Sequence, residues 1–206
     1  MTPQTLLGLA LFAFAVSITP GPNNTMLIAS GVNFGFRPTI PHMLGIDLGF
    51  SIMLVAVGLG VGSLFAAVPA LQAVVRYGGA AYLVYLAWKI ARSGAPGAGE
   101  SRPRPMGFVQ AALFQWVNPK GWMGAIGAVA TYTPADRFFA NLLIVTAVYA
   151  LVMAPCICVW AALGTALRRL LDEPRWMRAF NVTMALLLLA SLYPTLADSS
   201  GVLRWR

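Results

Sequence analysis

The residues whose types and spacing could do chemistry lie at two interruptions of otherwise apolar sequence. At the first, Pro20, Gly21 and Pro22 precede Asn23 and Asn24. Proline lacks the N–H donor that a helix interior needs, and its ring clashes with the preceding turn. We therefore expect one helix to end here and another to begin, with Gly21 as N-cap and Pro22 at the first helical position. The free N–H groups of that new N-terminus, next to two side-chain amides, are suited to binding a carboxylate.

The second interruption contains Gln115, Asn118, Pro119 and Lys120. Asparagine before proline predicts an N-cap followed by a new half-helix. Lys120 has three candidate partners: a substrate carboxylate, Asp47, or the membrane interface, which its long side chain can reach. The amides at both interruptions have a simpler role as well, which is to satisfy backbone groups that the prolines leave free. That role is compatible with contact to a substrate.

Asp47 is the one acidic residue that falls inside a predicted membrane segment. A carboxylate at such depth costs about 3 to 10 kcal/mol, depending on the scale used. The functional interpretation is that Asp47 binds a substrate ammonium, carries a proton, or does both in turn. The alternative is an interfacial carboxylate paired with a neighbour such as Lys120 or His42. His42 itself is interpreted as a local hydrogen-bonding residue, with a proton relay as its alternative.

The elements that must position these residues are apolar helices. Of the 206 residues, 59 % are hydrophobic and 10 % are charged, whereas a soluble domain carries about a quarter charged residues. Crossing a bilayer takes about 20 apolar residues. Six segments reach that length, and they cover residues 5–36 (broken), 40–65, 71–90, 108–132, 139–163 and 177–196. The composition therefore predicts an all-α membrane protein in contact with the lipid bilayer.

The basic residues responsible for the net charge of +8 lie mostly in the loops between these segments. One side is predicted to hold Arg37, Lys89, Arg92, Arg102, Arg104, Arg168, Arg169, Arg175 and Arg178. The other side is predicted to hold Arg76, Arg137, Arg204 and Arg206. Membrane proteins keep the more basic loops in the cytoplasm, so we expect both termini outside. The excess charge needs no nucleic-acid partner.

The two cysteines, Cys156 and Cys158, are one residue apart on a predicted helix and do not share a face, which disfavours a disulfide or a metal pair.

The order of segments repeats on either side of a Gly-, Pro- and Ser-rich linker at residues 93–105. Each half, about 1–92 and 106–206, contains a broken, a long and a short segment within one transporter domain, 1–206. Because each half has three crossings, the second is inserted upside down. The expected fold is six transmembrane helices as a 3+3 inverted repeat, with helices 1 and 4 broken. Paired interruptions of this kind point to a transport site near the bilayer midplane.

Four motifs carry a resemblance to a known family: TPGPNN at residues 19–24, Gly35-Phe36-Arg37, GGAAYLVYLAWK at 78–89 and NPKGW at 118–122. In this order they resemble the lysine exporter (LysE/RhtB) family of bacterial amino-acid exporters, and the first and third are most similar to its cysteine and O-acetylserine branch. The resemblance implies a multi-pass protein of the bacterial inner membrane that moves amino acids or small derivatives outward, driven by the proton gradient. It does not fix the substrate, since neighbouring branches carry homoserine, threonine, lysine, arginine or leucine.

The expected function is therefore proton-coupled export of a small zwitterionic amino acid. The expected substrate-binding residues are Pro20, Gly21, Pro22, Asn23, Asn24, Asp47, Gln115, Asn118, Pro119 and Lys120, with Asp47 also coupling protons. An enzyme would need a nucleophile–base pair, a carboxylate dyad or a metal cluster, and the sequence predicts none, nor a cofactor. A passive channel, a structural subunit of a membrane complex and an uptake carrier stay open as alternatives. A homodimer joined through small-residue helix faces is also compatible with the sequence.

Overall fold

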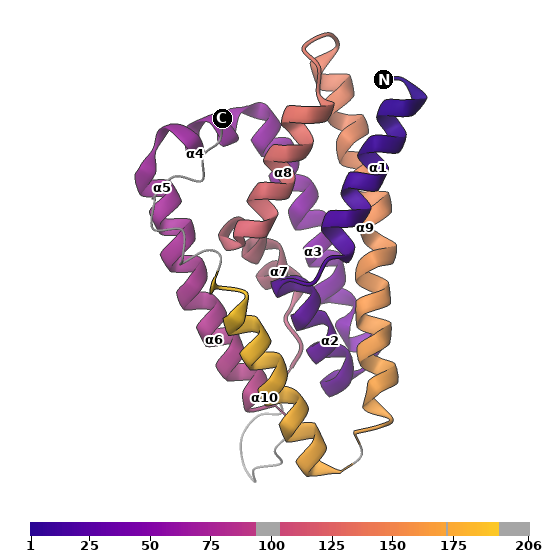
Figure 1. Ribbon diagram of the computed structural model, residues 1–206, viewed down its shortest axis with the longest axis vertical. Coiled ribbons are helices and arrows are strands. Elements are labelled where there is room, and N and C mark those ends of the chain that lie inside the picture. Colours follow the sequence, from indigo (N-terminus) through magenta and orange to yellow (C-terminus); the bar gives the residue numbers. More distant parts are fainter. Residues whose placement is uncertain (94–103, 172, 194–206) are drawn as a thin grey trace.

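The computed structural model describes residues 1–93, 104–171 and 173–193 of the chain (Figure 1). This described part is helical throughout and contains no strand. The helices are α1 (Pro3–Ile18), α2 (Pro22–Phe34), α3 (Phe36–Ala56), α4 (Gly62–Ala67), α5 (Pro69–Ala73), α6 (Gly79–Ala91), α7 (Phe108–Phe114), α8 (Pro119–Tyr132), α9 (Phe138–Arg168) and α10 (Pro174–Ala190). Short π-helical turns join α3 to α4 (η1, Val57–Val61) and α5 to α6 (η2, Val74–Gly78), and a 3₁₀ turn follows α7 (η3, Gln115–Val117).

Both proline motifs break helices as predicted. Helices α1 and α2 are bent by 57° at a break that has Gly21 as N-cap and Pro22 in the first turn. Helix α7 ends in the 3₁₀ turn, and Asn118 then caps α8, whose first residue is Pro119. Figure 1 shows α1 above α2 and α8 above α7, so the two breaks lie at similar height and the two broken elements run in opposite directions.

Membrane-spanning character is clearest for a subset of the predicted segments. In the described residues, Phe36–Ala67 and Phe138–Arg168 are each long and apolar enough to cross a bilayer, and the bent α1–α2 pair provides a third candidate span. Helix α10 has 17 residues, and residues 194–196 of its predicted segment lie outside the described part. The predicted linker lies largely outside it too, as do Arg102, Arg204 and Arg206. The count of six crossings stays a prediction.

The residue types also predict a turn at residues 35–38 and an interruption of the fifth segment at Pro155. The turn is present, but Gly35 alone makes it, because α3 begins at Phe36. Gly35 has φ of 87°, a conformation that glycine adopts without the steric cost that other residues meet. Pro155 does not interrupt the fifth segment, since it lies inside the continuous α9. A proline removes one hydrogen bond of the helix ladder, and the turns on either side hold α9 together through their own bonds and their packing on α1, α2 and α3.

Glycines allow the close approach of several helices. A Cβ on Gly31 of α2 would meet the backbone of α9 at Ala161 and Thr165, and one on Gly164 of α9 would meet the backbone of Ile28. In the same way, Gly45 and Gly49 of α3 lie directly against α7. Such small residues let membrane helices approach to backbone contact. The face of α3 that carries Gly45 and Gly49 is therefore buried against α7 of the same chain. A homodimer would need other surfaces.

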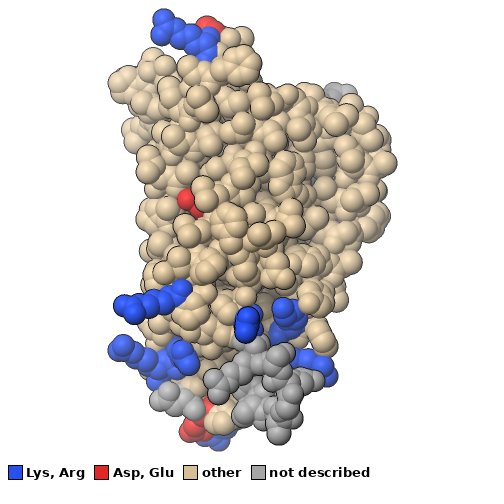
Figure 2. Space-filling view, turned by 180° about the vertical axis from the view of Figure 1, so that it is seen from behind, with Lys and Arg blue, Asp and Glu red and all other residues tan. Residues whose placement is uncertain are grey.

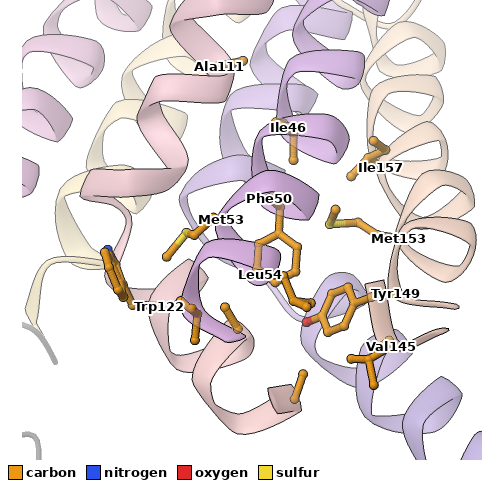
Figure 3. Close-up of a cluster of buried hydrophobic side chains, with 14 of the residues drawn as sticks. Ile46, Phe50, Met53, Leu54, Ala111, Trp122, Val145, Tyr149, Met153 and Ile157 are labelled. Carbon is orange, nitrogen blue, oxygen red and sulfur yellow. The ribbon is translucent and has the colours of Figure 1, made fainter. Parts of the chain in front are cut away.

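The buried side chains form two clusters. The larger joins α1, α2, α3, α7, α8 and α9. In it the ring of Phe50 on α3 packs on the ring of Tyr149 on α9, with 4.6 Å between ring centroids and the ring planes tilted by 34° (Figure 3). The smaller includes Leu83 and Leu86 of α6 and Leu188 of α10, together with Met26 of α2. Helices α6 and α10 pack on each other and reach the rest of the chain through α2 and α7. The larger cluster holds the two breaks in place.

Basic side chains gather at one end of the molecule, with fewer at the other (Figure 2). At the basic end, the side chain of Arg168 approaches Gly35 in the α2–α3 turn. Asn181 of α10 donates a hydrogen bond to the Ser93 carbonyl and exchanges hydrogen bonds with Asn33 of α2. The ends of α2, α6 and α9 and the first turns of α10 therefore meet at this end. The arrangement agrees with the charge asymmetry that the sequence predicts.

Candidate binding site at the two helix breaks

A pair of amides joins the two breaks directly. Asn23 Nδ2 donates to Gln115 Oε1 at 2.9 Å, and Gln115 Nε2 donates to Asn23 Oδ1 at 3.3 Å. Gln115 has no exposed surface, and its Nε2 also donates to the Ala111 carbonyl at 2.8 Å. Residues 92 apart in the sequence are thus held together by a reciprocal, partly buried hydrogen-bonded pair. The proximity of the breaks that the paired interruptions predicted is present in the fold.

The carbonyls at the end of α1 are satisfied by side chains. Pro20 and Pro22 have no N–H, so the last turn of α1 cannot complete its own ladder. Asn24 Nδ2 donates to the carbonyls of Ser17 and Thr19, each at 2.9 Å. Lys120 Nζ, which comes from the other break, donates to the Thr19 carbonyl at 2.6 Å and to the Pro20 carbonyl at 3.4 Å. An ammonium group is therefore bound at the C-terminal end of a half-helix, where the partial negative charge of the helix favours a cation.

The structure distinguishes between the three partners that the sequence left open for Lys120. In the described residues it forms no ion pair with Asp47, and its ammonium lies on the carbonyls of the first break instead. The side chain is half-buried. Gly21 makes room for it, because a Cβ at that position would lie 3.0 Å from Lys120 Cδ and 3.1 Å from Nζ.

The N-termini of the two half-helices differ. At α8, the Asn118 side chain accepts a hydrogen bond from the Lys120 N–H at 3.2 Å, and the Asn118 carbonyl accepts from Gly121 at 2.9 Å. At α2, the N-cap is Gly21, which has no side chain to offer. The first N–H groups of α2 therefore have no cap, whereas those of α8 are already covered. An anion would find free donors at α2.

A small cavity of about 40 Å³ lies between the breaks. Its polar lining comes from Ser17, Asn23, Asn24, Gln115, Asn118, Lys120 and Tyr149, with Gly21 and Gly121 beside them. A water needs roughly 10 to 15 Å³ of such space, so the cavity has room for a few waters and not for an amino acid. In this conformation the space between the breaks is therefore smaller than an amino acid.

Ser17 and Tyr149 are cavity residues that the sequence reasoning missed. Both side-chain hydroxyls are buried and face each other, with no other hydrogen-bond partner in the described part of the chain. Tyr149 is 1 % exposed, and its ring packs on Phe50, which also lines the cavity (Figure 3). A tyrosine in mid-helix among apolar residues is a signal that could have indicated the site, because a buried hydroxyl requires a partner.

Other predicted residues lie beside the cavity rather than on it. Pro20, Pro22 and Pro119 shape the breaks without lining the cavity, and Pro22 is buried while Pro20 is exposed. Asp47 does not line it either. One of its carboxylate oxygens is buried without a hydrogen-bond partner in the described residues, and the carboxylate lies within electrostatic range of Cys158 on α9. His42 is 1 % exposed, with no hydrogen bond at either ring nitrogen within the described ranges. No group of three or more metal-ligating residues occurs in those ranges.

Apolar spans, a bent helix pair and polar groups gathered at its break define a helical membrane protein built around an internal polar site. Residues 14–191 match the family model of the LysE type translocator. The chain belongs to this family.

Curated relatives match along nearly the whole chain. A cysteine/O-acetylserine efflux protein of Salmonella choleraesuis (strain SC-B67) is 35 % identical over 191 residues, which cover 91 % of this chain and 95 % of the relative. The protein of the same name from Escherichia coli (strain K12) is 32 % identical over 190 residues, with coverage of 91 % and 95 %. No solved structure matches the chain.

Proposed function

We propose that this protein exports small zwitterionic amino acids or their derivatives, of the cysteine and O-acetylserine kind, across the bacterial inner membrane. The observation that supports the proposal most is the contact between the two breaks, where Asn23 pairs with Gln115 and Lys120 binds the carbonyls of α1. Breaks that meet inside a bundle give a transporter its central site. The names of the relatives supply the substrate class.

In the proposed bound state, the substrate takes the place of the Lys120 ammonium. Lys120 Nζ marks a position at which the Thr19 and Pro20 carbonyls accept hydrogen bonds from a cation. The substrate ammonium binds there, and the displaced Lys120 turns to the substrate carboxylate. The uncapped N–H groups of α2 bind the other side of that carboxylate. The hydroxyls of Ser17 and Tyr149, which face each other in the cavity, then form hydrogen bonds to the substrate.

Asp47 is assigned to the proton rather than to the substrate. It lies on α3 one turn from Phe50, which lines the cavity, and it has a buried oxygen without a partner in the described residues. Cys158 is the titratable neighbour that faces it from α9. Protonation from outside neutralises the carboxylate, which removes the cost of holding a charge inside the bundle during the return step. The carrier resets in this way after each export step.

The opposed directions of the two broken helices support a 3+3 inverted repeat of six crossings, and the basic end is assigned to the cytoplasm. Movement of one half relative to the other then opens the small central cavity to each side in turn. A carrier of this design couples export to the proton gradient, whereas a channel or a structural subunit does not.

The test is an export assay in cells that overexpress the protein, with a panel of cysteine, O-acetylserine, homoserine, threonine and basic amino acids. We expect efflux of cysteine and O-acetylserine to rise severalfold and to stop when the proton gradient is collapsed. Flux that survives the collapse indicates a channel, and no flux for any panel member indicates a structural subunit. Asp47→Asn is expected to abolish proton-driven export while one-for-one substrate exchange continues. Export by Asp47→Asn that still follows the gradient at every pH would remove Asp47 from the coupling.

A further inference from the structure

A second and larger cavity lies toward the basic end of the molecule. Its volume is about 90 Å³, compared with about 40 Å³ for the cavity between the breaks. It is bounded by α2, α6, His42 of α3 and residues 104–106 before α7. None of the site residues at the breaks lines it. The proposed transport site therefore leaves this cavity without a role.

The two cavities are stacked along the same three elements. Helix α2 contributes Asn24 to the first cavity and Ala29 to the second, and α3 contributes Ile46 and His42 in the same way. The α7–η3 segment contributes Gln115 and Gln110. These spacings of four or five residues correspond to about 6 to 7.5 Å at helical rise. A molecule in the second cavity would thus be about one helical turn from the first, on the side of the basic end.

The lining of the second cavity is suited to an anionic group. Lys89 and Arg104 are its charged residues, and it has no acidic one. Both side chains are exposed, and no ion pair to either occurs in the described ranges. Hydroxyls and amides of Ser30, Asn33, Tyr82 and Gln110 surround them. The Lys89 ammonium lies 5.7 Å from the ring centroid of Tyr85, which also lines the cavity. Arg92 is a nearby basic residue of the same end that does not line the cavity, and its guanidinium lies 4.8 Å from the ring centroid of Trp88.

His42 indicates that a ligand completes this cavity. The imidazole is 1 % exposed, and neither ring nitrogen has a hydrogen-bond partner in the part of the chain that the structure describes. Its neighbours Ser30 and Thr39 bond to each other instead, and the Thr39 hydroxyl donates to the Gly35 carbonyl. A buried polar side chain without a partner costs about 1 to 3 kcal/mol. A structural histidine at this position would be expected to have found a partner.

We propose that the second cavity is a collecting site that binds the carboxylate of the amino acid at the basic end, before the substrate moves to the breaks. Lys89 and Arg104 attract and hold the carboxylate, and His42 at the inner wall donates to it as the cavity opens. This inference rests on the proposed export function and adds an outer binding step to it. Changes to Lys89, Arg104 or His42 are therefore expected to alter the half-saturating concentration for transport and to leave the maximal rate unchanged.

The test uses the full chain in vesicles of neutral phosphatidylcholine, with O-acetyl-L-serine as the transported probe. We expect Lys89→Gln with Arg104→Gln to raise the half-saturating concentration about fivefold, as for the loss of exposed charge contacts, at an unchanged maximal rate. The matched control is Arg92→Gln, which removes a charge from the same end and is expected to leave the half-saturating concentration unchanged. An equal effect of the control, or no effect of the double variant, overturns the inference.

His42→Leu supplies a readout that a structural role would not give. Replacing an unpartnered buried imidazole with an apolar side chain is expected to keep or raise the melting temperature, while the half-saturating concentration rises at least threefold. A variant that is less stable, or that saturates as the wild type does, overturns the role of His42.

Two further outcomes separate the sources of failure. If the double variant behaves as the wild type in neutral vesicles and shows its defect in vesicles with anionic lipid only, the cavity binds a lipid headgroup and the inference is overturned. If the wild-type protein moves no member of the amino-acid panel, the proposed function fails and the inference falls with it. Normal wild-type transport together with an ineffective double variant overturns the collecting site alone.

Discussion

Proline causes both helix breaks, but the N-termini of the two helices that follow are capped differently. At α8, the Asn118 side chain accepts from the Lys120 N–H and the Asn118 backbone carbonyl accepts from the Gly121 N–H, so this N-terminus is complete within the chain. At α2, the glycine cap leaves the first N–H groups uncovered, and the preceding carbonyls of α1 are held by Asn24 and by Lys120 from the other break. The first break therefore has free backbone donors, whereas the second has a complete N-terminus and contributes the Lys120 side chain to the first.

The largest effect is expected from Lys120→Met. This change removes the cation that joins the breaks and, in the proposed mechanism, the partner of the substrate carboxylate. Hydrogen bonds to charged groups contribute about 1.5 to 3 kcal/mol, so we expect the transport rate to fall by about 10- to 100-fold in the export assay. Arg169→Met, which removes an exposed positive charge at the end of α9, is the control. A Lys120→Met protein that transports at the wild-type rate would show that the first break works without the second.

Gly21→Ala is expected to have the next largest effect. The extended φ of 178° at Gly21 suits any residue, so the change acts through the new Cβ, which would lie 3.0 Å from Lys120 Cδ. The lysine must shift, and we expect transport to fall about threefold to tenfold, because small misplacements at a site are costly. The melting temperature should change little. Gly8→Ala on α1 is the matched control, since its Cβ would lie 3.6 Å from Tyr132, at ordinary contact distance. Equal transport by both variants would argue against a role for the Lys120 position.

The amide pair between the breaks is tested by a double-mutant cycle of Asn23→Ala and Gln115→Ala. Their side chains bond reciprocally, so the losses in unfolding free energy should not add. We expect a coupling of about 1 kcal/mol, measured by denaturation of the protein in detergent. Asn33 paired with Asn181 offers a matched cycle away from the breaks. Additive losses at Asn23 and Gln115 would mean that the breaks are held together by packing alone.

The sequence predicts the breaks well and the surroundings less well, for physical reasons. Proline, glycine and asparagine act on the backbone within a few residues, so Gly21 and Asn118 could be identified as caps from their neighbours alone. The bond from Lys120 to the α1 carbonyls depends on how two distant helices approach, which left three partners open. Asp47 does not line the cavity, because the rotation of α3 is set by the contacts of Gly45 and Gly49 with α7, and no local pattern fixes that rotation.

The smallest effect, and the one that most sharpens the difference between the breaks, is expected from Asn118→Ala. The change removes the side-chain cap of α8, which should lower the free energy of unfolding by about 1 kcal/mol, and Asn118→Ser should restore most of that loss. Because the uncapped α2 already supplies donors to the substrate in the proposed mechanism, the half-saturating concentration for transport should change less than twofold in either variant. If Asn118→Ala instead binds substrate much more tightly, the newly freed N–H groups of α8 have joined the site. The two breaks would then be equivalent in their capacity to bind a carboxylate, and the asparagine cap would be the one feature that keeps them different.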